Sequence, residues 1–145
     1  MKKNKKVTSR IEKLCAENGV KFTHQRRIIA EVISNSDDHP DANEVYLRAN
    51  KIEPRISLAT VYRTIKLFEE HNVLNRIELG GKRARYEELN EDEHHDHLID
   101  INSGEIIEFV NEEIEKLQTK VANKLGYELV DHRMELFGKK ILKKN

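Results

Sequence analysis

Five consecutive residues of this sequence, Glu93-His94-His95-Asp96-His97, combine three imidazoles with two carboxylates. Both groups are ligands for divalent ions such as Mn²⁺, Fe²⁺, Co²⁺ and Zn²⁺. The segment that contains the last four and continues as LIDI favours a strand, in which successive side chains point to opposite faces. His95 and His97 therefore share one face. His94 and Asp96 share the other, so the pattern predicts two incomplete metal sites, back to back.

Each half-site needs further ligands, because a divalent ion takes about four to six. His39 and His132 are histidines flanked by carboxylates, and Glu108 and Glu115 follow the cluster. Ligands from both sides of the acidic segment 89–93 would tie two parts of the chain together, and a bound ion would favour one arrangement of them.

Two other interpretations of the cluster remain open at this point. One is a solvated histidine-rich loop, and the other is a hydrolase in which a metal activates water. No nucleophile elbow or phosphate-binding glycine loop supports the hydrolase, since the glycines fall at turns and helix ends.

Composition narrows the class of protein. Cys15 is the only cysteine, so no disulfide can form within the chain, and its place in a helical apolar pattern predicts a packed thiol in a reducing compartment. No apolar run approaches the ~18 residues that span a bilayer, and the lysine-rich first six residues, expected to be a mobile arm, lack a signal-peptide core after them. We expect a soluble, cytoplasmic protein with no membrane partner.

The formal net charge is zero, but the charges are unevenly distributed. Residues 1–90 contain 18 Lys+Arg and 13 Asp+Glu, which is net +5, whereas residues 91–145 contain 8 and 13, which is net −5. The first part suits phosphates and the second suits cations.

Four helical patterns fill the first part of the chain: TSRIEKLCAENG, THQRRIIAEVISN, DANEVYLRANK and SLATVYRTIKLFEEH. The expected N-caps of the last three are Thr23, Asp41 and Ser57. The expected apolar stripe of the fourth helix consists of Leu58, Val61, Ile65 and Phe68. The period then changes to two, and VLNRIEL, a GGK turn and RARYEEL predict a β-hairpin.

A winged helix-turn-helix has this order of elements: several helices, the last two joined by a short turn, and then a β-hairpin. The polar face of the fourth helix carries Tyr62, Arg63 and Lys66 and has no acid before Glu69. Arg63 and Lys66 can meet guanine edges or phosphates, so this face favours a DNA groove over a solvated surface. A metal-independent winged-helix adaptor is a further alternative.

After the connector, HHDHLIDI, an NSG turn and EIIEFV predict a second hairpin, and NEEIEKLQTKVANKLG predicts an amphipathic helix. YELVDHRMELFGK predicts a last strand that includes His132. Such a small layer has an open face that a second copy would cover. The predicted fold class is α+β: an N-terminal winged helix-turn-helix domain at 1–88, a hinge at 89–93, and a C-terminal α+β dimerisation and metal-binding domain at 94–145.

Six segments together resemble the ferric uptake regulator family, in order, over residues 8–138: GVKFTHQRRIIAEVI, DHPDANEVY, SLATVYRTIKLFEEHNVL, GGKRARYE, HHDHLIDINSGEIIEF and GYELVDHRMELFG. The resemblance implies a homodimeric transcriptional repressor, not an enzyme, that binds double-stranded operator DNA. Fe²⁺ or Mn²⁺ would activate it, Zn²⁺ or Co²⁺ could substitute, and no small-molecule substrate is implied. A peroxide-sensing or zinc-responsive regulator is the alternative within the family.

The resemblance also implies site positions. The regulatory metal site, which bridges the two domains, would consist of His39, Glu87, His95, His97 and Glu108. Glu88 is the alternative to Glu87, because the connector is one residue longer than in many members. The second metal site, inside the dimerisation domain, would consist of His94, Asp96, Glu115 and His132. The DNA-contacting residues would be Lys21, Arg26, Tyr62 and Arg63.

One departure from the family pattern is large. Many members hold a structural zinc with two Cys-x-x-Cys pairs, but Asp100 and Ser103 stand where the first pair would fall, and there is no second pair. A four-cysteine zinc site is therefore impossible. We expect the dimer to form through apolar packing and strand pairing, as in the subset of the family that has the HHDHLID form and lacks this zinc.

Overall fold

The computed structural model describes residues 9–79, 83–89 and 94–142 of the 145-residue chain. The chain divides into two compact units, Met1–Asn90 and Glu91–Asn145. The division falls inside the segment 89–93 that the sequence marks as a hinge. The lysine-rich arm, the Gly-Gly turn and most of that hinge lie outside the described residues.

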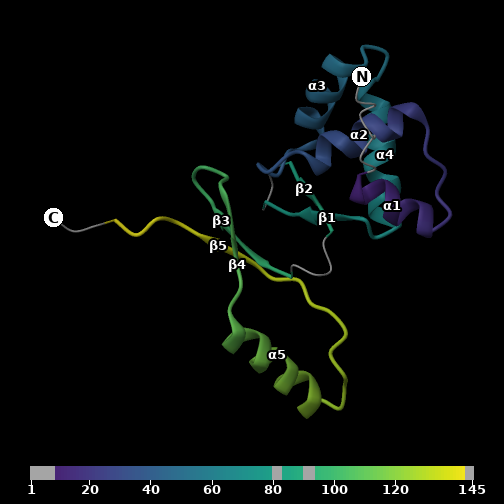
Figure 1. The fold of residues 1–145 in the computed structure, drawn as a ribbon. Helices are drawn as coiled ribbons and strands as arrows, with labels where there is room; N and C mark the ends of the chain where they lie inside the picture. The colour runs from purple at the N-terminus through teal and green to yellow at the C-terminus, as the bar shows by residue number, and fades with distance from the viewer. Residues whose placement is uncertain (1–8, 80–82, 90–93, 143–145) are drawn as a thin grey trace, which may run out of the picture. The chain divides into compact units, whose positions relative to one another are not determined.

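The first unit is a winged helix-turn-helix (Figure 1). Its helices are α1 (Arg10–Glu17), α2 (His24–Ser34), α3 (Ala42–Ile52) and α4 (Leu58–Glu70), and its antiparallel strands are β1 (Leu74–Ile77) and β2 (Arg85–Glu88). The caps predicted at Thr23, Asp41 and Ser57 are confirmed, because each side chain accepts a hydrogen bond from the backbone N–H three residues later. Each such cap stabilises its helix by about 1 kcal/mol.

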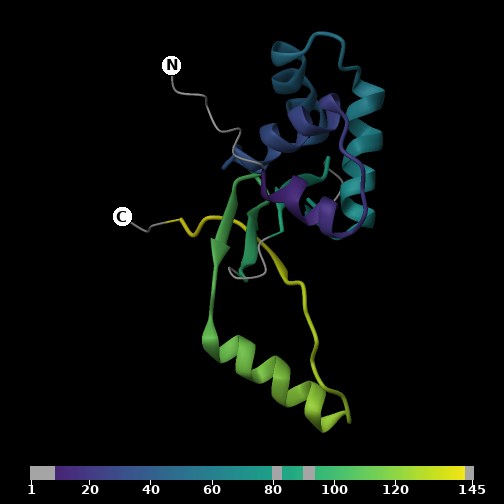
Figure 2. The ribbon, with the colours of Figure 1, turned by 45° about the vertical axis from the view of Figure 1, so that its right-hand side comes forward.

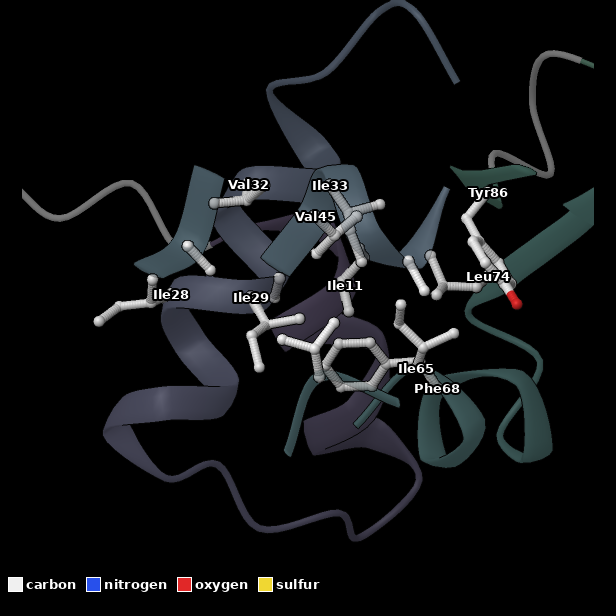
Figure 3. Close-up of a cluster of buried hydrophobic side chains, with 14 of the residues drawn as sticks. Ile11, Ile28, Ile29, Val32, Ile33, Val45, Ile65, Phe68, Leu74 and Tyr86 are labelled. Carbon is white, nitrogen blue, oxygen red and sulfur yellow. The ribbon is translucent and has the colours of Figure 1, made fainter. Parts of the chain in front are cut away.

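The core of this unit surrounds the ring of Phe68, on which the ring of Phe22 stacks with centroids 5.7 Å apart. Figure 3 shows aliphatic side chains gathered around that ring, among them Ile11, Ile29 and Ile65. Cys15 is fully buried in the same cluster, as predicted, and burial raises the pKa of its thiol. The core thus fixes α4 against the other helices.

One residue that the sequence places in the core is exposed in the structure. Leu58 is 39% exposed, although the helical spacing places it on the apolar stripe of α4. Ile56, just before the Ser57 cap, is buried in its place. Ile56 and the buried Val61 occupy the positions of a hydrophobic staple, which leaves the first residue of the helix outside the core.

The second unit contains β3 (Asp96–Asp100), β4 (Ile106–Phe109), α5 (Glu112–Lys124) and β5 (Glu135–Gly138). The strand order is β4-β3-β5, with β3 antiparallel to β4 and parallel to β5. In both ribbon views α5 lies beyond the end of these strands (Figures 1 and 2). No described residue of α5 is buried, so the apolar line Leu117, Val121 and Leu125 is exposed to solvent in the single chain.

The last strand is shorter than predicted, and His132 lies before it rather than within it. The reason is the length of its partner: β3 begins at Asp96, and the register between the two strands starts at His97 opposite Glu135. Residues 127–133 have no equivalent stretch of β3 to pair with. No helix in the described ranges is long and apolar enough to cross a membrane.

Candidate metal centres and nucleic-acid surface

Four potential ligand atoms converge within the second unit: Nε2 of His94, Nε2 of His132, Oδ1 of Asp96 and Oε1 of Glu115. The two imidazole nitrogens lie 3.0 Å apart. The Asp96 oxygen lies 3.2 Å from His132 Nε2 and 3.7 Å from His94 Nε2. The Glu115 oxygen lies 3.4 Å from each imidazole nitrogen. We call this group the four-ligand cluster.

The spacing of the four-ligand cluster fits a divalent ion. Four ligands placed tetrahedrally at ~2.1 Å from an ion are about 3.4 Å from one another, and the measured separations of 3.0 to 3.7 Å lie on both sides of that value. Asp96 is 1% exposed, and its Oδ2 has no hydrogen-bond partner among the described residues. Burial of a carboxylate is unfavourable unless it is paired or hydrogen-bonded, and an ion at this place would provide a partner for both oxygens.

The parallel pairing of β3 and β5 brings the two histidines of the cluster together. His97 is opposite Glu135, and its backbone N–H donates to the carbonyl of Met134. Three residues before each member of that pair stand His94 and His132. The two histidines are far apart in the sequence, and it is the strand register that places them at equivalent positions.

The first unit carries two of the residues implied for the regulatory site. Nε2 of His39 lies 3.0 Å from Oε2 of Glu87, and both side chains are largely buried. The other oxygen of Glu87 accepts a hydrogen bond from Nδ2 of Asn75 at 3.0 Å. Glu87, and not the alternative Glu88, is thus the carboxylate beside His39, while Oε2 of Glu88 is buried without a hydrogen-bond partner among the described residues.

His39 has a left-handed backbone, with φ of +51°. This conformation disfavours a residue with a Cβ by roughly 1–3 kcal/mol and persists only where neighbouring contacts hold it. On the side of β2, Arg85 Nη1 donates to the carbonyl of His39 at 3.3 Å, and the Tyr86 N–H donates to the carbonyl of Pro40 at 3.0 Å. The hairpin that presents Glu87 therefore also anchors His39.

The second unit carries the other three residues implied for the regulatory site: His95, His97 and Glu108. Nε2 of His95 lies 3.4 Å from Oε1 of Glu108, and His97 is directly opposite Glu108 in the β3–β4 register. The rings of His95 and His97 meet nearly edge to face, with centroids 4.9 Å apart. These three residues gather on one side, apart from His94 and Asp96 in the four-ligand cluster.

Two residues near these ligands are missing from the sequence-based sets. Asn75 is the cross-strand partner of Glu87, and Glu135 is the cross-strand partner of His97. Both residues could have been found only from their positions opposite a ligand on the neighbouring strand, and these positions depend on the pairing register.

The residues implied for DNA contact lie in the first unit around α4. Tyr62, Arg63 and Lys66 are exposed on that helix, and Arg63 and Lys66 line two adjoining concave surfaces. One of these surfaces also includes Arg26, and the other includes Arg76 and Arg83 of the hairpin segment. Sequence reasoning missed the last two, although basic residues in the expected wing were the available signal.

Lys21 and Arg26 are joined by the structure. Arg26 Nη1 donates to the backbone carbonyl of Lys21 at 2.6 Å and so fixes the connection between α1 and α2. Lys21 is exposed there. Arg26 therefore orients the Lys21 segment in addition to any contact it makes with a phosphate.

Comparison with known proteins identifies the chain. The profile of the Ferric uptake regulator family matches residues 17–137. This protein belongs to the ferric uptake regulator family. It is 49% identical over 132 residues to the ferric uptake regulation protein of Rhizobium leguminosarum bv. viciae, which covers 91% of this chain and 92% of that protein.

Solved structures of family members agree. A zinc-bound manganese uptake regulator is 48% identical, with a TM-score of 0.69 over 90% of this chain and 98% of the other. The ferric uptake regulator of Pseudomonas aeruginosa with manganese is 33% identical, with a TM-score of 0.78 over 87% of this chain and 94% of the other. The predicted family and fold class are confirmed, and this member is a metal-responsive transcriptional regulator.

This member of the family closes its β3–β4 turn without cysteine thiolates. Oδ1 of Asp100 accepts hydrogen bonds from the backbone N–H groups of Asn102 and Ser103, at 2.9 and 3.3 Å. Oγ of Ser103 accepts from the N–H of Glu105 at 3.1 Å. The bonds from Asn102 and Ser103 lower the pKa of Asp100 below its ordinary value. With one cysteine in the whole sequence, a four-cysteine zinc site cannot form, and these two side chains order the turn instead.

Proposed function

We propose that this regulator represses transcription as a homodimer that binds operator DNA when Mn²⁺ or Fe²⁺ is bound. The observation that carries the proposal is the grouping of its ligands. His39 already lies beside Glu87 in the first unit, and His95 lies beside Glu108 in the second, with His97 opposite it. Each unit thus holds part of one nitrogen-and-oxygen ligand set.

The regulatory site takes ligands from both units. His39 and Glu87 are its contribution from the winged helix, and His95, His97 and Glu108 are its contribution from the β3–β4 hairpin. A bound ion would tie these two sets together and so favour one arrangement of the two units. An ion that prefers the DNA-competent arrangement ~100-fold shifts the equilibrium by about 2.7 kcal/mol, which is sufficient to turn weak binding into repression.

The four-ligand cluster is a second metal site that stabilises the dimerisation unit. His94, Asp96, Glu115 and His132 all belong to that unit, and five of the separations among their ligand atoms, 3.0 to 3.7 Å, support a tetrahedral arrangement. Nitrogen and oxygen ligands suit Mn²⁺, Fe²⁺, Co²⁺ and Zn²⁺ alike. Similar relatives are a ferric uptake regulation protein and a zinc-bound manganese uptake regulator, so we assign Mn²⁺ and Fe²⁺ as activators and leave Zn²⁺ and Co²⁺ as substitutes.

Dimerisation follows from the exposed apolar surface of the second unit. Leu117 and Val121 on α5 lie in line with Leu125 at its C-cap, and all three are between about half and three-quarters exposed in the single chain. A monomeric soluble protein rarely exposes such a line. A second copy that covers it also presents two recognition helices, Tyr62 and Arg63 on each, to the two half-sites of an operator.

The test is a metal titration of DNA binding with the full-length protein. The probe is a duplex selected from a random library in the presence of Mn²⁺, and binding is followed by fluorescence anisotropy with Mn²⁺, Zn²⁺ and, anaerobically, Fe²⁺ at buffered free concentrations. We expect Mn²⁺ or Fe²⁺ to tighten binding at least 10-fold in the wild type. His97→Ala is expected to remain a folded dimer whose DNA affinity does not respond to either ion.

Two results would reject parts of this proposal. An equal response of the wild type and His97→Ala would exclude the regulatory site as assigned. A response to Zn²⁺ alone would replace the proposed activators with zinc. Iron-dependent loss of DNA binding after peroxide treatment would instead favour the peroxide-sensing alternative.

A further inference from the structure

Arg48 of α3 contacts the segment that carries His39. Its Nη1 donates to Oγ of Ser36 at 2.8 Å and to Oδ1 of Asp38 at 2.9 Å. Its Nη2 donates to the second carboxylate oxygen, Oδ2 of Asp38, at 2.5 Å. A guanidinium that engages both oxygens of a carboxylate and a neighbouring hydroxyl fixes direction as well as distance.

This contact completes a two-sided hold on His39. Asp38, the residue before His39, is bound to α3 through Arg48. Pro40, the residue after it, accepts the backbone N–H of Tyr86 on β2, and the His39 carbonyl accepts from Arg85. The left-handed residue is thus fixed between helix and hairpin, with its imidazole 3.0 Å from Glu87.

The hold is not needed to build α3. That helix already has its N-cap, Asp41, which accepts from the N–H of Glu44 at 2.8 Å, and Val45 and Ala49 bury its apolar face. Arg48 points toward the acidic segment before His39, and its Nη2 also lies 3.8 Å from Oε2 of Glu44, one turn earlier on α3. Its three hydrogen bonds are therefore directed at the conformation of the loop.

We propose that Arg48 is a positioning residue for the regulatory metal site. It touches no ligand atom, and it acts by holding Ser36 and Asp38 so that the backbone turns at His39 and aims the imidazole at Glu87. This inference rests on the proposed role of His39 as a ligand. Outer residues that orient ligands typically change metal affinity by 10- to 100-fold, and we expect Arg48→Gln to weaken Mn²⁺ binding at the His39 site about 10-fold.

The sign of the effect separates positioning from simple electrostatics. Loss of a positive charge near a cation site should tighten the binding of a divalent ion, whereas loss of the hold on His39 should weaken it. Arg48→Lys sharpens the test, because it keeps the charge but loses the planar fork. We expect Arg48→Lys to weaken Mn²⁺ binding as well, by a smaller factor than Arg48→Gln.

The experiment is a double-mutant cycle with the metal alone. Free Mn²⁺ is measured by electron paramagnetic resonance during titration of the wild type, His39→Ala, Arg48→Gln and the double variant, and thermal melting of the metal-free proteins sets a temperature at which all are folded. If Arg48 acts through His39, Arg48→Gln has no further effect on Mn²⁺ affinity in the His39→Ala background. Arg55→Gln, which removes an exposed guanidinium beyond α3, is the control and should leave the affinity unchanged.

The outcomes distinguish the two proposals. If His39→Ala does not reduce Mn²⁺ binding, the regulatory site as assigned is wrong. If His39→Ala reduces it but Arg48→Gln and Arg48→Lys leave it unchanged or tighten it, only the role of Arg48 is wrong. Should Arg48→Gln fail to fold, the same cycle run with Arg48→Lys decides the question.

Discussion

The imidazoles of His94 and His132 meet with their Nε2 atoms 3.0 Å apart and their ring centroids 4.4 Å apart, at an interplanar angle of 70°. Two neutral imidazole nitrogens that both point lone pairs at each other repel, and a proton or a cation between them removes the repulsion. The carboxylates of Asp96 and Glu115 close the same space, so the pair is arranged for a cation.

Removal of one of these histidines is expected to remove a metal site. His132→Ala should bind one fewer Co²⁺ per chain than the wild type and lose the thermal stabilisation that the metal gives. At a free metal concentration of ~100 times Kd that stabilisation is about 2.7 kcal/mol. Co²⁺ absorbance and calorimetry measure the two quantities. His24→Ala, at the exposed start of α2, is the control, and equal stoichiometry for both variants would contradict the assignment.

A charge on α5 should prevent dimer formation. Val121 lies in the exposed apolar line of that helix, and Val121→Glu would place a carboxylate in the proposed interface, where desolvation is unfavourable. Sedimentation at micromolar concentration should find a dimer for the wild type and a monomer for the variant. Lys120→Glu changes the neighbouring polar residue and should remain dimeric. A dimeric Val121→Glu would place the interface elsewhere.

Loss of Arg63 should weaken DNA binding without a change in metal binding. The side chain is exposed on α4, and an arginine that meets a base or a phosphate there contributes on the order of 1–3 kcal/mol. Arg63→Ala at saturating Mn²⁺ should therefore bind the selected duplex about 10-fold more weakly or worse. Lys139→Ala, an exposed change in the second unit, is the matched control. If fluorescence anisotropy finds the same DNA affinity for both variants, α4 is not part of the DNA-binding surface.

The core of the first unit makes a sharper energetic prediction. Phe68 is fully buried and stacks on Phe22, so Phe68→Ala should lower the free energy of unfolding of this unit by roughly 3–5 kcal/mol. Leu58→Ala, on the same helix but partly exposed, should lower it by less than about 1 kcal/mol. Urea denaturation followed by circular dichroism gives both values, and similar losses would mean that the core is not centred on Phe68.

The β3–β4 turn should depend on pH through Asp100. Its folded pKa lies below the ordinary value of about 3.9, so its charge stabilises the turn above that pH, and the contribution is lost as the pH falls through the folded pKa. Asp100→Asn keeps an oxygen acceptor but no charge. The wild type should melt above the variant from pH 7 to pH 5, and the difference should shrink below pH 4. A constant difference across that range would contradict the role of the charge.

The first unit was largely predictable because local rules decide most of it. The caps Thr23, Asp41 and Ser57 and the change from helical to alternating spacing after α4 are properties of neighbouring residues. The prediction that Leu58 is buried was wrong because Ile56, two positions earlier and outside the helix, occupies the core instead. The spacing of apolar residues within a helix does not show whether a residue just outside the helix will be buried instead.

The candidate sites were only partly readable. Strand alternation separates His95 and His97 from His94 and Asp96, but the assignment of the other candidate ligands to one site or the other, and Glu87 itself, came from resemblance to the family. His132 was expected inside a strand, since its sequence alternates, and only the short length of β3 excludes it from the pairing. The contact from Arg48 to Asp38 depends on how α2 and α3 pack, which no local pattern specifies.

The Asp100 turn sets the conditions under which this regulator can work. A thiolate zinc site fails when zinc is withdrawn or when its sulfurs are oxidised. Here a carboxylate and a hydroxyl hold the turn, and neither reacts with disulfides, mild oxidants or chelators. The conformation of the β3–β4 turn therefore needs neither bound zinc nor a reduced thiol.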